Sequence, residues 1–421
     1  MDLTKNKPRI FYGWYIVTAS AFIMIFTGGV THLGFTTVFE PIAEEFGWSY
    51  AQISLAASLR GFESGLLAPL IGFLVDRWGP RKLIFGGGIL LCLGFLLLSQ
   101  INSLIMFYAS FVIIAIGMST CMGTVMLTAV ASWFRRKYGL ASGIVASGFG
   151  LGGIMVPIMT MLIYALEWRM ALVTIGFSTL AVVLPLSLVM RHKPEQYGYQ
   201  PDGGLTNTAI FDNTQISSAS PEISFTAKQA LKHRAFWHIA IAGACQAFII
   251  GAVVTHIMPY LSSIGANRSV SSFIALMIPL TSIGGRLSGG WLCDRVGRKP
   301  IFIASFTLMT IGLLVFAFVT ENSLWLLIPF VITFSFGWGF AVTTRISLLR
   351  EHFGIGSFGK IFGLMTGIVM LGNMSGAPLA GWIYDTWQNY QGAWLLFCAV
   401  TITAIILTFT LPRKSSALTL G

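Results

Sequence analysis

Charged side chains are scarce in this chain. Only 10% of its 421 residues are Asp, Glu, Lys or Arg, whereas 55% are hydrophobic and the mean hydropathy is +0.79. Because a soluble domain averages about a quarter charged residues, this chain has too little polar surface to cover a water-soluble particle of its size. The composition excludes an ordinary soluble protein and predicts an integral membrane protein.

Cysteine is also sparse, and its spacing has no pattern. The five residues lie inside or beside apolar stretches, at Cys92, Cys121, Cys245, Cys293 and Cys398. They lack the spacing of a disulfide framework or of a zinc site, and such cysteines behave as small buried hydrophobic side chains. We therefore expect neither a disulfide nor a metal centre.

One short motif occurs twice, 218 residues apart. The first copy, GFLVDRWGPRK, begins at Gly72, and the second, GWLCDRVGRK, begins at Gly290. Each copy separates two long apolar stretches. A motif repeated at equivalent places indicates two related halves, a plan found in membrane proteins with internal structural repeats.

Twelve apolar stretches are long enough to cross a bilayer, for which a helix needs about 20 residues. They cover approximately 12–38, 50–74, 83–100, 104–132, 139–163, 169–190, 236–261, 270–292, 300–319, 323–349, 359–383 and 391–411. The long polar segment 191–234 separates the first six from the last six. We predict an all-α membrane protein with a bundle over 1–190, a linker loop over 191–234 and a bundle over 235–421.

The basic residues indicate the orientation. Of the 26 Lys and Arg residues, 21 fall in the segments on the side of the N-terminus and only two, Arg169 and Arg268, fall on the other side. Basic loops stay on the cytoplasmic side of a membrane, so both termini and the linker are predicted to be cytoplasmic, with the plasma (inner) membrane as the expected location. The net charge of +11 is explained by this asymmetry and does not indicate nucleic-acid binding.

The twelve stretches, the central loop and the duplicated motif together resemble the major facilitator superfamily of secondary transporters. A second internal match agrees: YGLASG begins at Tyr138 and FGKIFG at Phe358, and each copy continues through Leu-Gly to a proline, Pro157 or Pro378. The FYGW sequence from Phe11 and the lone Arg286 in the eighth stretch are similar to the monocarboxylate transporter and oxalate/formate antiporter branch. The resemblance implies two six-helix bundles around a central cavity.

The duplicated motif carries candidate gating residues. Asp76 and Asp294 each end a helix beside an arginine, where a following helix N-terminus can hold a carboxylate in one state and release it in another. We predict gating roles for Asp76, Arg77, Arg81, Asp294 and Arg295. The alternative is that the basic residues only fix the topology.

Charges inside membrane spans are the candidate substrate ligands, because they cost free energy and are kept for function. A guanidinium matches a carboxylate bidentately, and the resemblance implies that Arg286 binds the carboxylate of the substrate. The alternative is a structural arginine that backbone carbonyls satisfy. From their depth in the spans, we predict that Arg60, Phe35, Met122, Gln246 and Trp338 also line the site.

Three residues are candidates for proton coupling: Glu63, which shares a helical face with Arg60, and the histidines His32 and His256, whose side chains titrate near neutral pH. Each has a structural alternative, as an ion pair or as a hydrogen-bonded packing residue. Eukaryotic carriers of this branch place an aspartate and a lysine where this chain has Ser282 and Gly34, so proton symport is not inherited from the resemblance. Arg345 is expected to reach the cytoplasmic interface.

The nucleotide-like segments carry no nucleotide function. The segment from Gly354 to Ile361 lacks the P-loop Ser/Thr, and the GxGxxG from Gly148 lies inside a membrane span. We expect no cofactor and no enzyme activity. The predicted function is transport of a small organic anion, a monocarboxylate, with proton symport or anion exchange. The alternatives are efflux of a larger amphipathic or cationic compound and a membrane sensor that transports nothing.

Overall fold

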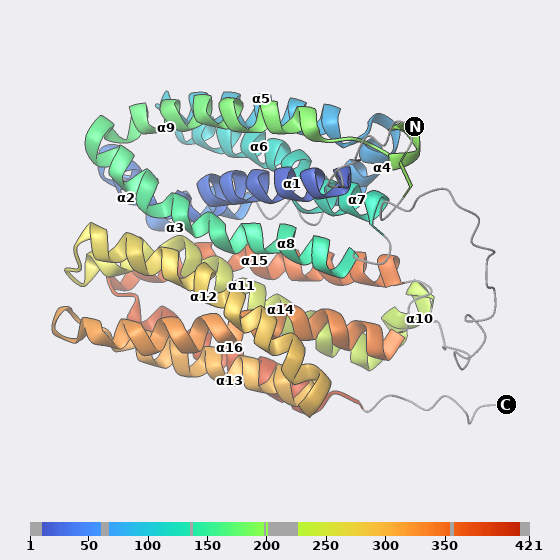
Figure 1. Cartoon of the computed structure of the whole chain (residues 1–421). Helices are drawn as coiled ribbons and strands as arrows, with labels where there is room; N and C mark the ends of the chain where they lie inside the picture. Colours follow the sequence, from blue (N-terminus) through green and yellow to red (C-terminus); the bar gives the residue numbers. More distant parts are fainter. Residues whose placement is uncertain are drawn as a thin grey trace, which may run out of the picture.

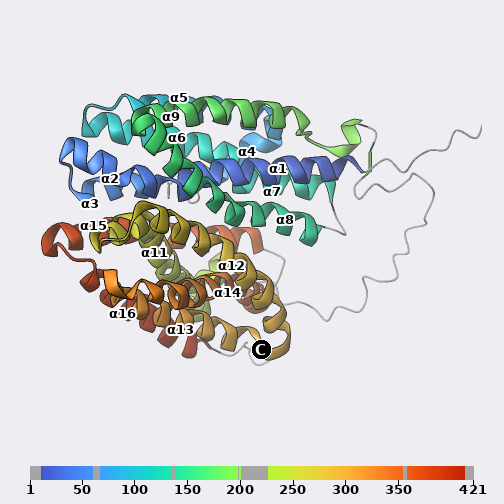
Figure 2. The ribbon, with the colours of Figure 1, turned by 60° about the vertical axis from the view of Figure 1, so that its left-hand side comes forward.

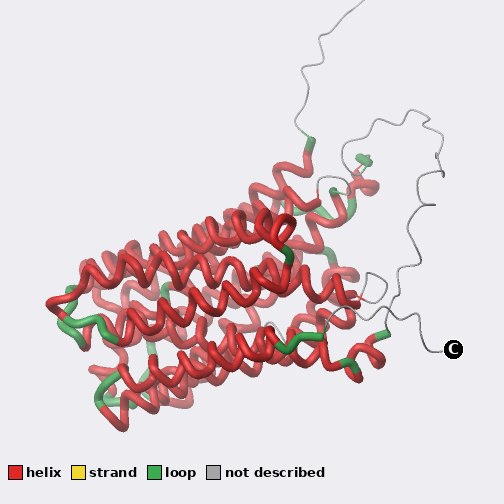
Figure 3. The backbone as a smooth tube through the Cα atoms, turned by 90° about the horizontal axis from the view of Figure 1, so that it is seen from below, coloured by secondary structure: helices red, strands yellow, loops and turns green. Residues whose placement is uncertain are grey.

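The structure is a computed structural model that describes residues 11–59, 67–134, 138–197, 199–200, 226–353 and 358–412. Every regular element in these ranges is helical, and the helices lie side by side in two groups (Figure 1). The group from α1 to α9 and the group from α11 to α16 remain separate when the molecule is turned (Figure 2). Figure 3 shows that the helices run lengthwise and that the loops gather at two ends.

The first group contains most of the chain up to residue 197. Its elements are α1 (Tyr12–Gly28), η1 (Gly29–Leu33), α2 (Phe35–Phe46), α3 (Tyr50–Leu59), α4 (Ala68–Trp78), α5 (Pro80–Ser99), α6 (Leu104–Cys121), α7 (Gly123–Trp133), α8 (Tyr138–Leu151), η3 (Gly152–Ile154), α9 (Met155–Val189) and η4 (Pro194–Tyr197). We call this group the N-terminal bundle.

The second group follows the polar segment. Its elements are α10 (Ala227–Lys232), α11 (Arg234–Ser263), α12 (Arg268–Val296), α13 (Arg298–Ala317), η7 (Glu321–Leu326), α14 (Leu327–Phe353), α15 (Phe358–Trp387) and α16 (Gln391–Phe409). We call this group the C-terminal bundle. Each bundle has its own hydrophobic core: one core is built from residues between Ile16 and Met190, and the other mainly from residues between Ala230 and Leu411.

Ten stretches of the described chain are long and apolar enough to cross a membrane. The difference from the twelve predicted spans has two local causes. The fifth and sixth predicted spans form one continuous stretch, Leu140–Val189, in which the backbone breaks at Glu167 with a φ of 61°. The second predicted span is divided between α3 and α4, and residues 60–66 between them lie outside the described ranges.

The duplicated motif forms the same turn in both bundles. Gly79 ends α4 with a φ of 78°, and Gly297 ends α12 with a φ of 100°. A residue with a side chain rarely adopts these angles, whereas glycine does so readily. A new helix begins directly after each glycine, at Pro80 and Arg298. The repeated sequence therefore encodes a repeated helix-to-helix corner.

The second internal match is also structural. Helices α8 and α15 begin at the equivalent residues Tyr138 and Phe358. Further along, a Cβ on Gly152 would lie 2.9 Å from the Ile25 carbonyl oxygen of α1, and a Cβ on Gly372 would collide with the Ala244 carbonyl oxygen of α11. Small residues let membrane helices approach closely, so the two glycines support equivalent helix pairs in the two bundles.

The molecule has two distinguishable ends. At the end that we call the linker end, α9 finishes at Val189, whose carbonyl oxygen accepts a 2.9 Å hydrogen bond from the Tyr12 hydroxyl at the start of α1. At the opposite end, which we call the far end, α2 turns into α3 and α15 turns into α16. These two ends provide the frame in which the site is placed.

Candidate functional site

The two bundles are joined at the far end by a carboxylate that caps a helix of the other bundle. Asp385, near the end of α15, accepts a 2.8 Å hydrogen bond from the backbone N–H of Tyr50 and another of 2.8 Å from that of Ala51. These are the first two residues of α3, whose N–H groups have no partner within their own helix. A carboxylate is favourable there because it also meets the positive end of the helix dipole.

A histidine forms a second connection at the far end. His256 of α11 is fully buried, and its Nε2 lies 2.8 Å from the Ser54 hydroxyl of α3 and 2.9 Å from the Ala377 carbonyl oxygen. Its Nδ1 lies 2.8 Å from the Tyr390 hydroxyl. Since a carbonyl only accepts hydrogen bonds, we assign the proton to Nε2, and Nδ1 then accepts from Tyr390. The histidine is thus held by hydrogen bonds at both ring nitrogens.

Two further hydrogen bonds complete this contact. The Arg268 guanidinium donates to the Thr37 carbonyl oxygen, and the Met258 backbone N–H donates to the Thr36 hydroxyl at 3.3 Å. The hydrogen bonds that join the described parts of the two bundles thus gather mainly at this end. We call the set formed by Asp385, His256, Arg268 and Met258 with their partners the far-end closure.

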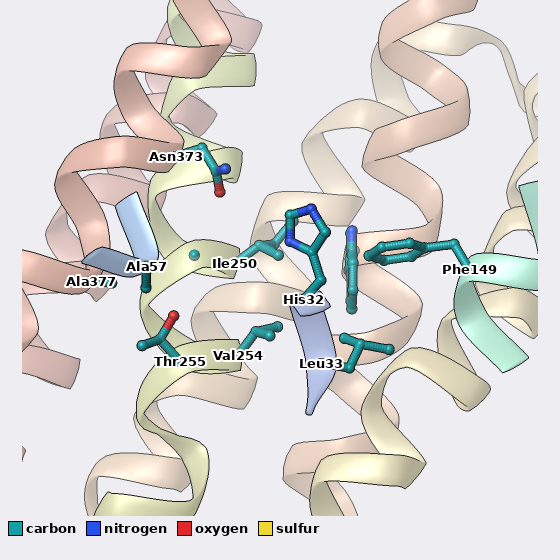
Figure 4. Close-up of a pocket in the computed structure, with 11 residues that line it drawn as sticks. His32, Leu33, Ala57, Phe149, Ile250, Val254, Thr255, Asn373 and Ala377 are labelled. Carbon is teal, nitrogen blue, oxygen red and sulfur yellow. The ribbon is translucent and has the colours of Figure 1, made fainter. Parts of the chain in front are cut away.

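A cavity of about 130 Å³ lies between the bundles, next to the far-end closure on its linker-end side. One buried water needs about 10–15 Å³ by such a measure, so the cavity has room for a small organic solute. Both bundles contribute to its wall (Figure 4), through His32, Leu33, Ala57, Phe149, Ile250, Gly251, Val254, Thr255, Trp338, Asn373 and Ala377.

The wall is mostly apolar, with a few polar groups. Figure 4 shows His32 from the N-terminal bundle and Thr255 and Asn373 from the C-terminal bundle around one space. His32 belongs to η1, a π-helical turn, and such turns are frequent at functional sites. Its ring stands edge to face against Phe149 at 5.7 Å between centroids. An apolar wall with few polar groups is typical of a small-molecule site.

Arg286 of α12 lies between the bundles beside this cavity. Its guanidinium carbon is 5.8 Å from the centre of the Trp338 ring, within the range of a cation–π contact. Its Nη1 donates one long hydrogen bond of 3.4 Å to the Ala146 carbonyl oxygen of α8, and its Nε is buried without a partner. Arg286 is not itself part of the cavity wall and reaches it through Trp338.

A second arginine lies inside the membrane in the same region. Nη1 of Arg345, on α14, donates a 3.2 Å hydrogen bond to Oε1 of Gln246 on α11. The Gln246 amide in turn donates to the Trp338 carbonyl oxygen at 3.4 Å, and the Nε of Arg345 is buried without a partner. The expectation that Arg345 reaches the cytoplasmic interface was wrong, because its side chain turns inward to α11.

Neither arginine has an acidic partner among the described side chains. The ion pairs formed there lie near the two ends of the molecule, between Arg169 and Glu45 and, at 2.9 Å, between Arg298 and Glu351. The interior of the described chain is therefore positively charged beside the cavity.

The structure separates the predicted lining residues. Trp338 lines the cavity, whereas Gln246 is buried, is not part of the cavity wall and accepts a hydrogen bond from Arg345. Phe35 and Met122 are not part of this cavity wall either. Phe35 is 3% exposed and packs against Phe111 in the N-terminal core, and Met122 is 5% exposed in the same core. Depth in the membrane was inferred for both, but depth does not determine which side of a helix faces the cavity.

Several predicted residues lie beyond what the structure describes. Arg60 and Glu63 fall within the undescribed segment 60–66, and the side chains of Asp76 and Asp294 are also outside the description. Of the predicted gating arginines, Arg77 and Arg81 are exposed, and exposed Arg295 lies over the Trp291 ring at 4.0 Å. Within the described ranges, no group of three or more His, Cys, Asp or Glu side chains is arranged to hold a metal ion.

Two helix bundles of a membrane protein, joined at one end around a cavity for a small solute, define the class of polytopic membrane transporters. Within that class, the chain belongs to the Major Facilitator Superfamily, whose family model matches residues 14–358 and 257–420. The sequence resemblance to this superfamily and to its monocarboxylate and oxalate/formate branch is confirmed.

The chain is similar to curated relatives over almost its whole length. It is 27% identical to "Monocarboxylate transporter 12" of Mus musculus, over 96% of this chain and 86% of the relative. It is 23% identical to "Oxalate:formate antiporter" of Oxalobacter formigenes, over 95% of this chain and 92% of the relative. The solved structure of a mutant of the nucleoside transporter NupG has a TM-score of 0.73 and 14% identity, over 96% of this chain and 100% of that one. This last similarity concerns the fold alone.

Proposed function

We propose that this protein transports a small organic anion, a monocarboxylate, and that Arg286 binds the carboxylate. The observation that carries the proposal is the position of Arg286, which lies between the bundles, at the level of the cavity, without an acidic partner among the described side chains. An isolated charge inside the membrane is costly unless it is paired. A carboxylate in the cavity would supply the missing partner.

The hydrogen bond to Ala146 uses only one of the hydrogen-bond donors of Arg286. A guanidinium has five N–H donors, and the 3.4 Å contact with the carbonyl oxygen uses one of them at a long distance. The remaining donors suit the bidentate recognition of a carboxylate. The names of the relatives, a monocarboxylate transporter and an oxalate:formate antiporter, support a carboxylate as the substrate.

Two modes of coupling satisfy charge balance, proton symport and anion exchange. At the place where eukaryotic carriers have an aspartate, Ser282 is buried and donates its hydroxyl hydrogen to the Pro279 carbonyl oxygen at 2.7 Å. This position offers no carboxylate for a proton. Exchange of one anion for another needs no such group, and Glu63, His32 and His256 remain the candidates if a proton is carried.

The far-end closure supports an alternating-access mechanism. Because the far end is joined, we infer that a solute reaches the cavity from the linker end, which the basic loops predict to be cytoplasmic. Opening the other way requires that Asp385 leave the start of α3 and that the bundles meet at the linker end, where the duplicated Asp-Arg motif is expected to act as the gate. Rocking of one bundle against the other provides this exchange.

Uptake into proteoliposomes tests the proposal. We expect wild-type protein to accumulate at least one of labelled lactate, pyruvate, acetate and oxalate, and Arg286→Gln to reduce the uptake at least tenfold. Arg350→Gln is the matched control, because Arg350 is exposed at the end of α14, and it should retain uptake. Preloading with unlabelled anion or imposing a pH gradient distinguishes exchange from symport. Two outcomes would contradict the proposal. One is undiminished carboxylate uptake by Arg286→Gln, and the other is uptake of a lipophilic cation and no carboxylate by the wild-type protein.

A further inference from the structure

His256 connects the wall of the cavity to the far-end closure. Its neighbour in the chain, Thr255, lines the cavity, and its Nε2 lies 2.9 Å from the carbonyl oxygen of Ala377, another residue of the wall. From the other bundle, the Ser54 hydroxyl contacts the same Nε2 at 2.8 Å, one helical turn before the wall residue Ala57. Figure 4 shows Thr255, Ala377 and Ala57 around one part of the cavity. A solute in this part of the cavity therefore lies next to the groups that His256 joins.

The Nε2–H group of His256 is shared between two acceptors. The Ala377 carbonyl oxygen belongs to the same bundle as His256, whereas the Ser54 hydroxyl belongs to the other bundle. The ring nitrogen has one hydrogen to donate, so the two hydrogen bonds compete for it. When the bundles separate, this hydrogen can bond to the Ala377 oxygen alone, and the histidine keeps a partner.

The Ser54 hydroxyl also keeps a partner after such a separation. It donates its own hydrogen to the Tyr50 carbonyl oxygen within α3, so its contact with His256 uses only an acceptor lone pair. On the other side of the ring, Nδ1 stays bonded to Tyr390 of the same bundle. A buried donor without a partner is costly, and here neither side is left with one. The contact between His256 and Ser54 can therefore break and form again at low cost.

Both helices that His256 joins within its own bundle carry a proline at this level. Pro259 lies three residues after His256 in α11, and Pro378 follows Ala377 directly in α15. Proline removes a backbone hydrogen bond of the helix and bends it. The far-end parts of α11 and α15 are thus able to bend away from α3, and His256 lies where the bending starts.

The same contact leads to the carboxylate that caps α3. Tyr50, whose carbonyl oxygen accepts the hydrogen of Ser54, is the first residue of α3, and its N–H group donates to Asp385. One chain of hydrogen bonds therefore runs from the cavity wall through His256 and Ser54 to the cap. Release of Ser54 removes a contact that holds the start of α3 beneath Asp385.

We propose that His256 is a positioning residue that makes the opening of the far end depend on the solute in the cavity. When the cavity is empty, the Nε2–H group holds Ser54 and, with it, α3. A carboxylate bound by Arg286 fills the space against Thr255 and Ala377, and the hydrogen bond then goes to the Ala377 oxygen alone. His256 is fully buried and contacts no solute itself, and this role needs no change in its protonation. The inference rests on the proposed function, because the solute is the anion that Arg286 binds.

Accessibility of a cysteine in the far-end closure tests this role. Met258→Cys places the reporter where the native side chain is 1% exposed, and it keeps the backbone N–H that donates to Thr36. The protein in proteoliposomes is labelled with a membrane-impermeant maleimide added at the far end, with and without lactate, pyruvate, acetate or oxalate. We expect the carboxylate that the protein takes up fastest to raise the labelling rate about fivefold or more, the lower limit of a typical coupling between two sites.

Two variants, made in the reporter protein, each keep one half of the imidazole. In His256→Asn the amide oxygen takes the place of Nδ1 and retains Tyr390, but no donor reaches Ser54. In His256→Gln the amide nitrogen takes the place of Nε2 and retains the donor. We expect His256→Asn without carboxylate to label about threefold to tenfold faster than its parent, the effect of losing one neutral hydrogen bond. Carboxylate should change this rate less than about twofold, because the two sites are no longer coupled, whereas His256→Gln should keep the response.

Melting temperatures in detergent accompany both variants, since each loses part of the hydrogen bonding of a buried ring. Ser54→Ala gives a second route to the same result, because it removes the acceptor in the other bundle and leaves His256 in place. It should label as fast as His256→Asn and respond as little to carboxylate.

The outcomes separate this inference from the proposed function. Equal responses to carboxylate in His256→Asn and His256→Gln would overturn the inference, because a histidine that only stabilised the contact would be damaged alike by both. A normal response in Ser54→Ala would also overturn it. If the parent takes up a carboxylate that does not change its labelling rate, the inference fails and the role of Arg286 stands. Absence of any carboxylate uptake by the parent would overturn both.

Discussion

In the proposed function, the chemistry of arginine determines which solutes the site recognises. Arg286 and Arg345 lie inside the membrane without acidic partners among the described side chains, and the indole of Trp338 lies beside Arg286. A lysine at either place would supply the same charge as a compact ammonium, but it lacks the planar set of N–H donors of a guanidinium. The identity of the cation, beyond its charge, is therefore a testable part of the mechanism.

We predict that Arg286→Lys retains transport with weaker binding. The ammonium still attracts an anion, but it loses the bidentate geometry of the guanidinium. We expect the KM for the transported carboxylate to rise about tenfold, as for loss of one good hydrogen bond, and kcat to fall less. Initial rates of uptake over a range of substrate concentrations measure both quantities. A KM equal to that of the wild type would show that bidentate binding by the guanidinium does not contribute to substrate affinity.

At the residue scale, the sequence indicated which residue types to examine better than it indicated their contacts. The isolation of Arg286 in an apolar stretch was visible in the sequence, because charged residues are rare in membrane spans. The prediction for Trp338, which lines the cavity, and those for Phe35 and Met122, which do not, came from the same criterion, depth. Successive residues of a helix point about 100° apart, and one uniformly apolar sequence does not show which direction faces the cavity. The inward turn of Arg345 depends on Gly243 of another helix, where a Cβ would lie 2.8 Å from Cδ of Arg345, and had no local signal.

At the scale of elements, closely packed helix pairs determine how each bundle is built. Gly152, in η3 directly after α8, allows that segment to pack on α1, and the equivalent Gly372 allows α15 to pack on α11. The sequence predicted these helices from their length and apolar content, and the repeated motifs marked where α8, α15 and the corners at Gly79 and Gly297 occur. It did not predict the break at Glu167 or the π-helical turn around His32, because both depend on how neighbouring helices pack.

We predict that Gly372→Val destabilises the C-terminal bundle. Its side chain would collide with the Ala244 carbonyl oxygen of α11, and relief requires α11 and α15 to separate. Overpacking of this kind costs about 1–3 kcal/mol. Thermal unfolding in detergent measures the loss. Gly367→Val on the same helix is the matched control, because no atom lies within 4 Å of a Cβ placed there. Equal melting temperatures for the two variants would contradict the prediction.

We also predict that Asp385→Asn weakens the far-end closure. The amide keeps the shape of the side chain but replaces one of the two accepting oxygens with a donor. It also loses the charge that favours the start of α3, an effect of about 0.3–1 kcal/mol for a helix N-terminus and up to about 2 in partly buried geometry. The far end should therefore open more often. A Thr255→Cys reporter, which lies in the cavity, should react faster with a membrane-impermeant maleimide added at the far end.

Two controls accompany this experiment. Glu44→Gln removes a carboxylate that is exposed at the same end of the molecule, and it should leave the labelling rate unchanged. Protein without the reporter gives the background from the five native cysteines, four of which are buried. If Asp385→Asn and Glu44→Gln label at the same rate, the cap on α3 does not hold the closure.

For the whole molecule, the two bundles are expected to move as rigid bodies. Each has its own hydrophobic core, whereas the described hydrogen bonds between them are few and concentrated at the far end. A few hydrogen bonds can be exchanged for others at the linker end without disturbing either core. This division supports the proposed rocking of one bundle against the other.

A disulfide across the far end should therefore stop transport without unfolding the protein. The Met258 backbone nitrogen lies 3.3 Å from the Thr36 side-chain oxygen, so the two residues are in direct contact across the far end, as a cross-link between them requires. We expect Thr36→Cys/Met258→Cys protein to lose uptake after oxidation and to regain it after reduction. Each single variant should be insensitive to both treatments. Substrate binding to the oxidised protein, measured by intrinsic tryptophan fluorescence in detergent, should persist, because the cross-link does not involve the residues that line the cavity. Uptake that continues when the cross-link is complete would show that the far end does not need to open during transport.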